Sequence, residues 1–322
     1  MQYVGEAIAL LVAALWTVAA LASEIASRRL GVFVMNVWRM SLALLLSLGL
    51  MWAFTGTTGL EYADAGAWSW LLLSGVVGYF FGDWCLFNSY LTIGSRYGQL
   101  FMTLAPVFTA LSAWLLLGQT MGWKALLAMA VTLAGIIISL PLHRREETRS
   151  GAVYAGDRVS LRGVLFGIGA AIGQGLGLVL SKMGLDRYEA SLPREVLEQA
   201  VYYLPFSANG VRCMAGLACF GMWYLLTRRR LVEKRQTFTD SFSNRTGLKA
   251  MTAAVVAGPF LGVGLSLMAV QYAAAGTTST LMAMTPILIL LPSRYLFGQE
   301  ITARNVVGAV ISVIGVSLFF LS

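Results

Sequence analysis

Asp83 is the acidic residue that lies deepest inside an apolar stretch of this sequence. In a helix, Tyr79 and Asp83 share one face at spacing i, i+4, so this face offers an aromatic ring and a carboxylate. An ionisable side chain inside a membrane is costly, and it therefore marks a functional site by default. We expect Asp83 either to bind a substrate or a coupling proton, or to form a structural pair with Arg39 or Arg212.

Two arginines stand inside apolar runs at matching positions, in the patterns Asn36-x-x-Arg39 and Asn209-x-x-Arg212. A guanidinium keeps its proton, so each arginine must reach the membrane interface, pair with an acid or bind an anionic ligand. All three alternatives stay open from the sequence. Lys182 lies near the end of an apolar run, where anchoring at the interface competes with contact to a substrate.

Uncharged polar and aromatic residues complete the expected substrate site. Their side chains can contact a solute, but they can equally well pack or form hydrogen bonds between helices. The expected site consists of Asp83, Tyr79, Trp16, Asn88, Gln174, Lys182, Arg39, Arg212, Gln271 and Tyr272. Pro106 and Pro286 are expected hinges, because proline interrupts the hydrogen bonding of a helix.

The composition places these residues in a lipid bilayer. Hydrophobic residues make up 58% of the 322 positions and charged residues 12%, unlike a soluble domain. Apolar runs of about twenty residues predict spanning helices and no β-barrel. The sequence thus predicts an all-α membrane protein of ten transmembrane helices, at 4–23, 33–54, 68–91, 97–117, 123–142, 161–182, 206–227, 249–272, 277–297 and 304–321.

An internal repeat organises the ten spans. Adding 180 to the residue number maps Pro106 onto Pro286 and Gly135 onto Gly315, and a shift of 182 maps Gly82 onto Gly264. Each copy holds five spans, an odd number, so the second copy must enter the membrane from the opposite side. We therefore expect two inverted five-helix repeats. The expected units are 1–142, a polar linker at 143–160, and 161–322 with an inserted loop at 183–205 and a basic loop at 228–249.

Basic residues are distributed unevenly between the two sides of the membrane. With both termini outside, the inner loops carry sixteen Lys and Arg and the outer side carries four. The positive-inside rule then predicts extracytoplasmic termini in the cell (inner) membrane. Because these basic residues cluster in short loops between spans, the formal charge of +8 indicates topology and no nucleic-acid partner.

The segment from Ser95 to Gly135, with Leu-Ala-Pro-Val-Phe ending at Phe108 and Leu-Leu-Gly-Gln ending at Gln119, resembles the signature of EamA-like transporters. This family belongs to the drug/metabolite transporter superfamily. The resemblance implies a ten-helix duplicated fold and a role in transport. It also implies roles for the first helix of each half, where relatives often carry Trp and, eight residues later, Lys. In this sequence the first half has Trp16 and Glu24 at these positions, and the second half has Gln174 and Lys182. Relatives are commonly drawn with cytoplasmic termini, and the charge count predicts the reverse here.

We expect a secondary transporter that exports a small metabolite, such as an amino acid, a drug-like molecule or another organic solute, by alternating access. A proton or an exchanged solute is a further expected partner, and the protein is expected to act as a monomer or homodimer. A flippase of a lipid or lipid-linked sugar is the alternative.

An intramembrane enzyme is a weaker alternative. The only histidine, His143, lies beside a basic loop, and the three cysteines have neither disulfide nor metal spacing. We therefore expect no enzyme activity, no metal and no cofactor.

Overall fold

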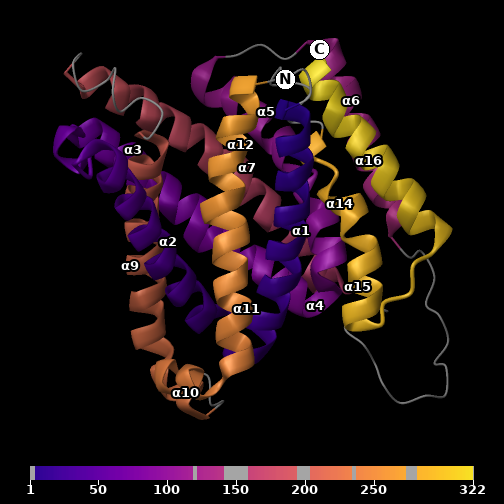
Figure 1. Ribbon diagram of the computed structural model, residues 1–322. Coiled ribbons are helices and arrows are strands. Elements are labelled where there is room, and N and C mark those ends of the chain that lie inside the picture. Colours follow the sequence, from indigo (N-terminus) through magenta and orange to yellow (C-terminus); the bar gives the residue numbers. More distant parts are fainter. Residues whose placement is uncertain are drawn as a thin grey trace.

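A computed structural model describes residues 4–118, 122–140, 159–193, 204–233, 237–272 and 281–321 (Figure 1). These residues form helices and turns, with no strand among them. The first half contains α1 (Val4–Leu30), α2 (Val32–Thr55), the 3-10 turn η1 (Leu60–Tyr62), α3 (Ala65–Ser74), the π-helical segment η2 (Gly75–Gly82), α4 (Asp83–Met102), α5 (Ala105–Leu117) and α6 (Trp123–Ser139). The second half contains α7 (Leu161–Ser191), α9 (Leu204–Glu233), α10 (Phe238–Ser243), α11 (Arg245–Val255), the π-helical segment η3 (Val256–Phe260), α12 (Leu261–Tyr272), α14 (Thr285–Leu288), α15 (Leu290–Phe297) and α16 (Ala303–Leu321).

The apolar helices confirm an all-α membrane protein. Among the described residues, six helices are long and apolar enough to cross a bilayer, and four shorter apolar helices accompany them. These segments overlap the predicted spans in chain order. Because only six reach the length of a span, the count of ten stays a prediction.

The chain reverses direction at Gly94, inside the segment assigned to α4. Gly94 has φ 82° and ψ 157°, a conformation that side chains other than glycine rarely adopt. Beyond it, the Gln99 side chain donates a 2.5 Å hydrogen bond to the hydroxyl of Tyr90, although nine residues of straight helix would span about 13 Å. One predicted span therefore ends before Gly94, and the next runs through the end of α4 into α5.

The two expected hinge prolines occupy matching places. A two-residue turn directly precedes α5 and another directly precedes α14, and Pro106 and Pro286 stand in the first turn of these helices. Proline is well tolerated there, because the first N–H groups of a helix have no intrahelical partner. The helix is thus already interrupted before each proline. A hinge motion at these sites stays a prediction.

Helices α6 and α16 pack closely and make the same contact twice. A Cβ on Gly135 would collide with the backbone of Ser312, and a Cβ on Gly315 would lie 2.5 Å from the backbone nitrogen of Thr132. The shift of 180 relates Thr132 to Ser312 and Gly135 to Gly315. Small residues let the two backbones approach. This reciprocal contact is the one that a two-fold axis between the halves would generate.

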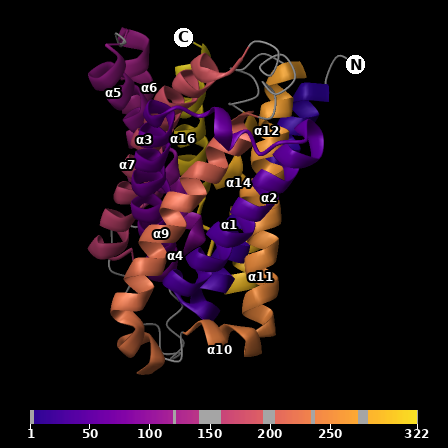
Figure 2. The ribbon, with the colours of Figure 1, turned by 90° about the vertical axis from the view of Figure 1, so that its left-hand side faces the viewer.

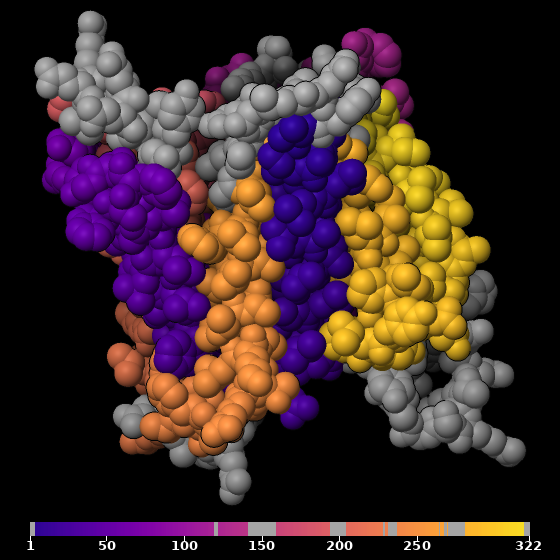
Figure 3. Space-filling view, viewed as in Figure 1, coloured from indigo at the N-terminus to yellow at the C-terminus, as the bar shows by residue number. Residues whose placement is uncertain are grey.

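Helices α2 and α9 also run antiparallel. The Phe33 ring near the start of α2 lies 6.4 Å from the Phe220 ring, whereas Ser47 near its end accepts a hydrogen bond from Asn209, near the start of α9. The first helix of each half packs against the third span of the other half: α1 contacts α11 and α12, and α7 contacts α3, η2 and α4. Figure 3 shows α11 and α12 lying between α1 and α2. Antiparallel packing of equivalent helices is expected of inverted repeats.

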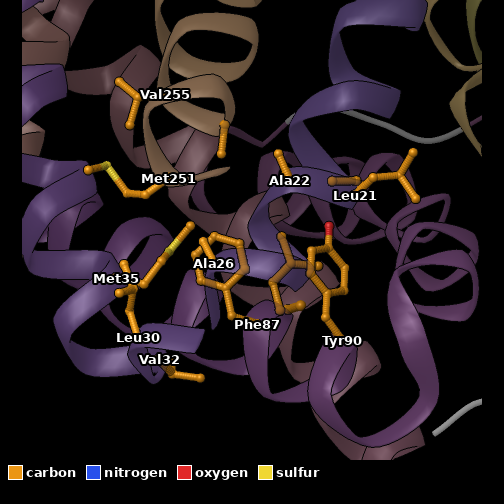
Figure 4. Packing of buried hydrophobic residues seen from close by; sticks show 14 of the residues in the cluster. Leu21, Ala22, Ala26, Leu30, Val32, Met35, Phe87, Tyr90, Met251 and Val255 are labelled. Carbon is orange, nitrogen blue, oxygen red and sulfur yellow. The ribbon is translucent and has the colours of Figure 1, made fainter. Parts of the chain in front are cut away.

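The largest buried apolar cluster joins both halves. Ala26 of α1, Met35 of α2, Tyr90 of α4 and Met251 of α11 belong to it, and each is at most 4% exposed. Figure 4 shows these side chains gathered between the four helices. The core therefore lies where the two repeats meet.

Turns rich in basic residues gather at one end of the molecule. The guanidinium of Arg28 lies 5.9 Å from the Phe297 ring, Arg96 donates to the carbonyl of Glu300, and Asn244 donates to the carbonyl of Arg29. Both chain termini lie at the end opposite to α10 (Figures 1 and 2). Residues 143–158 of the expected linker, 194–203 of the first expected loop and 234–236 of the second lie outside the described residues. The described parts of the two expected loops are largely helical, because α7 and α9 extend into them and α10 and the start of α11 lie within the second.

Candidate functional site

Asp83 sits at the junction of η2 and α4 and is held by side chains from two other helices. The Arg39 guanidinium of α2 donates to one carboxylate oxygen in an ion pair. The Gln174 amide of α7 donates to the other oxygen at 2.9 Å. The side chain of Asp83 is 2% exposed and that of Arg39 is 14% exposed. Both oxygens of a buried carboxylate are thus satisfied, as its burial requires.

The π-helical segment η2 brings the backbone close to α7 at this point. A Cβ on Gly173 would lie 2.6 Å from the Cα of Gly82, so the two chains approach as only glycines allow. About two turns earlier, the Ser74 hydroxyl donates to the carbonyl of Gly177 at 2.7 Å. A π-helical segment widens the turn and changes which side chains face a neighbour, and such segments are frequent at functional sites. This packing positions Asp83 beside Gln174.

Tyr79 lies between the two half-buried arginines, Arg39 and Arg212. The guanidinium carbon of Arg212, on α9, is 4.4 Å from the centre of the Tyr79 ring, and that of Arg39 is 5.9 Å away. These distances are in the range of cation–π interactions. The Tyr79 hydroxyl donates to the Asn209 side chain, and the Asn209 amide donates to the Ser47 hydroxyl at 2.9 Å. Hydrogen bonds from both halves therefore fix the ring.

The structure brings together five of the residues expected in the site: Asp83, Tyr79, Arg39, Arg212 and Gln174. Tyr79 and Asp83 both contact Arg39, as their shared helical face predicted. Arg39 pairs with the acid instead of reaching the membrane interface. The sequence had left Arg39 and Arg212 open as partners of Asp83, and the ion pair is with Arg39.

Three other expected residues make their contacts elsewhere. The Asn88 amide donates to the carbonyl of Trp84 within its own helix. Lys182 is exposed and forms an ion pair with Asp186 at 3.0 Å. Trp16 packs against a separate apolar cluster where α1 meets α12. The side chains of two further expected residues, Gln271 and Tyr272, lie outside the part that the structure describes.

A second buried charge, Glu24 on α1, was not among the residues expected in the site. One carboxylate oxygen pairs with Arg28 at 2.6 Å, and the other accepts from the backbone N–H of Ser95 at 2.7 Å. Glu24 is fully buried and stabilises the reversal at Gly94. Its spacing of four residues from Arg28 was the available sequence signal. Of the described residues, none belongs to a group of His, Cys, Asp and Glu that could hold a metal ion.

Long apolar helices in a duplicated arrangement, with buried charges where the halves meet, define a multi-pass membrane protein of the transporter class. The model of the EamA-like transporter family matches residues 3–140 and again residues 161–321. The chain therefore belongs to the EamA-like transporter family, in the drug/metabolite transporter superfamily. Membership means that the protein is a membrane transporter with a small-molecule substrate and a lipid environment.

A solved structure described as "Crystal structure of protein" is similar in fold. It matches 100% of this chain and 98% of its own, with a TM-score of 0.59 and 14% sequence identity. At this identity the likeness concerns the fold alone. The curated proteins include no match to the sequence.

Proposed function

We propose that this transporter exports a small organic solute by alternating access, and that the substrate site is built around Asp83, Arg39, Gln174, Tyr79 and Arg212. One observation carries the proposal: a buried cluster of charges is shared between the two halves. Asp83 and Arg39 come from the first half, and Gln174 and Arg212 from the second. A site between inverted repeats can open to either side of the membrane when one half rocks against the other.

The symmetric helix interruptions support this motion. The turns before Pro106 and Pro286 and the π-helical segments η2 and η3 lie at corresponding places in the two halves. Such interruptions are positions where a helix bends at low cost. We propose that they act as hinges, and that the units 1–142 and 161–322 move as the two bodies.

The distribution of basic residues supports an orientation with extracytoplasmic termini in the cell (inner) membrane. Asn244, directly before Arg245 at the start of α11, donates to the carbonyl of Arg29, at the same end of the bundle as Arg28 and Arg96. The positive-inside rule assigns that end to the cytoplasm.

Purified protein in lipid vesicles tests the proposed function. The vesicles are loaded with a water-soluble cell extract, and the solutes that leave are identified by mass spectrometry against protein-free vesicles. We expect one solute, or a few chemically related solutes, to leave faster when the protein is present. Movement of labelled lipids without release of any water-soluble compound would support the flippase alternative and contradict our proposal.

A further inference from the structure

Arg212 is a half-buried cation whose hydrogen-bonding capacity is left unused by the residues that the structure describes. The described residues provide its guanidinium with neither an ion pair nor a hydrogen bond, and its buried Nε has no partner. Its close charge contact is the face of the Tyr79 ring at 4.4 Å. An arginine carries five N–H donors, so leaving them unused inside a membrane protein is costly.

The only acid in the cluster is already engaged. Asp83 accepts from Arg39 with one oxygen and from Gln174 with the other. Asp83 pairs directly with Arg39 and also attracts Arg212, so among the described residues of the cluster two positive charges face one negative charge. A ligand that brings one negative charge would balance the cluster.

The unused hydrogen-bond donors of Arg212 lie along the edge of its guanidinium. The guanidinium carbon lies over the face of the Tyr79 ring, and a hydrogen bond from Tyr79 to Asn209 holds the ring in place. The N–H donors lie in the plane of the guanidinium and point outward from its edge. A carboxylate or phosphate accepts two parallel hydrogen bonds from this edge, an arrangement that lysine cannot reproduce.

We propose that Arg212 binds an oxyanion group of the substrate, a carboxylate or a phosphate, so that the transported solute is an organic anion. This inference rests on the proposed transport function and specifies its substrate class. The Arg39–Asp83 ion pair lines the site and carries no net charge. The Tyr79 ring orients Arg212, which binds the anion.

The loaded vesicles described above test the substrate class directly. We expect the solutes released by the protein to be anionic at neutral pH, and their chemical identity distinguishes carboxylates from phosphates. Release of only neutral or cationic solutes would refute the anion site while leaving the transport function intact. No release of any solute would count against the transport function itself.

Variants of Arg212 test the role of this residue. The transport rate of each variant is measured at increasing concentrations of the anion that the wild-type protein releases. For Arg212→Gln we expect the half-saturating concentration to rise about tenfold or more, because a charged hydrogen bond is lost. Arg212→Lys keeps the charge but loses the bidentate geometry, so it should be intermediate. Arg229→Gln is the matched control, because it removes an exposed arginine from the same helix, and it should behave as wild type.

Melting temperatures show whether each variant is folded. If Arg212→Gln does not fold, the half-saturating concentration of Arg212→Lys tests whether Arg212 binds the anion. An unchanged half-saturating concentration in a folded Arg212→Gln, or in Arg212→Lys when it alone folds, would overturn the assignment.

Discussion

Gln174 donates a 2.9 Å hydrogen bond to Asp83, which joins the first helix of the second half to the third span of the first half. The positions related to these two by the repeat are Trp16 and Leu265, and both pack against one apolar cluster. The same helix contact is therefore polar in one copy and apolar in the other. A symmetric scaffold can exchange conformations, while an asymmetric site gives the substrate a single orientation.

The Arg39–Asp83 pair predicts a specific pattern of stability. Asp83→Asn keeps the shape of the side chain but leaves Arg39 buried without a counter-charge, and breaking a buried pair in this way costs about 3–5 kcal/mol. We expect a clearly lower melting temperature for purified Asp83→Asn and for Arg39→Gln.

The double variant tests the coupling between these two residues. Removing both charges leaves no unpaired ion, so Arg39→Gln combined with Asp83→Asn should melt closer to wild type than either single variant. We expect the double variant to remain defective in vesicle transport, because the ion pair that we propose as part of the substrate site is removed. Additive losses of stability in the double variant would show that the two side chains do not act as a pair.

Membrane orientation is testable with single cysteines at opposite ends of the bundle. Ser243 is exposed on α10, within the basic loop, and Asp186 is exposed near the end of α7. In intact cells, an impermeant thiol reagent should label Asp186→Cys and leave Ser243→Cys unlabelled until the cells are opened. The opposite pattern would place the termini in the cytoplasm.

Local spacing accounts for what the sequence predicted about the site. Tyr79 and Asp83 face the same way because they lie four residues apart. A structural partner of a buried acid must be a cation, so the sequence left Arg39 and Arg212 as the candidate partners of Asp83. The choice of Arg39 depends on how α2 and α9 flank η2. That arrangement arises when the helices pack together, so the spacing of residues along the sequence does not predict it.

Contacts between distant segments were beyond the reach of the sequence. The hydrogen bond from Gln174 to Asp83 spans 91 residues, and that from Ser95 to Glu24 spans 71. The π-helical segments were also missed, because their apolar composition does not differ from that of an α-helix. The shift of 180 residues, in contrast, correctly related the equivalent packing positions on α6 and α16, since glycine or another small residue stands at these positions in both copies.

Glu24 is predicted to stabilise the chain reversal at Gly94. Glu24→Ala removes the acceptor of the buried Ser95 N–H and the partner of Arg28, and an unsatisfied buried donor costs about 1–3 kcal/mol. Glu24→Gln keeps an oxygen that can accept from Ser95, so its melting temperature should fall less. Equal losses for both variants would mean that the charge, and not the hydrogen bond to Ser95, is what stabilises the turn.

The reciprocal contact between α6 and α16 predicts equal effects from two distant substitutions. Gly135→Ala and Gly315→Ala each place a methyl group less than 3 Å from the backbone of the facing helix, and such overpacking costs about 1–3 kcal/mol. We expect both variants to melt below wild type by similar amounts. Gly221→Ala is the matched control, because nothing lies within 4 Å of its added methyl group and alanine favours a helix. Its melting temperature should be unchanged or higher. A large loss for only one of the two contact variants would show that the α6–α16 contact is not symmetric in the folded protein.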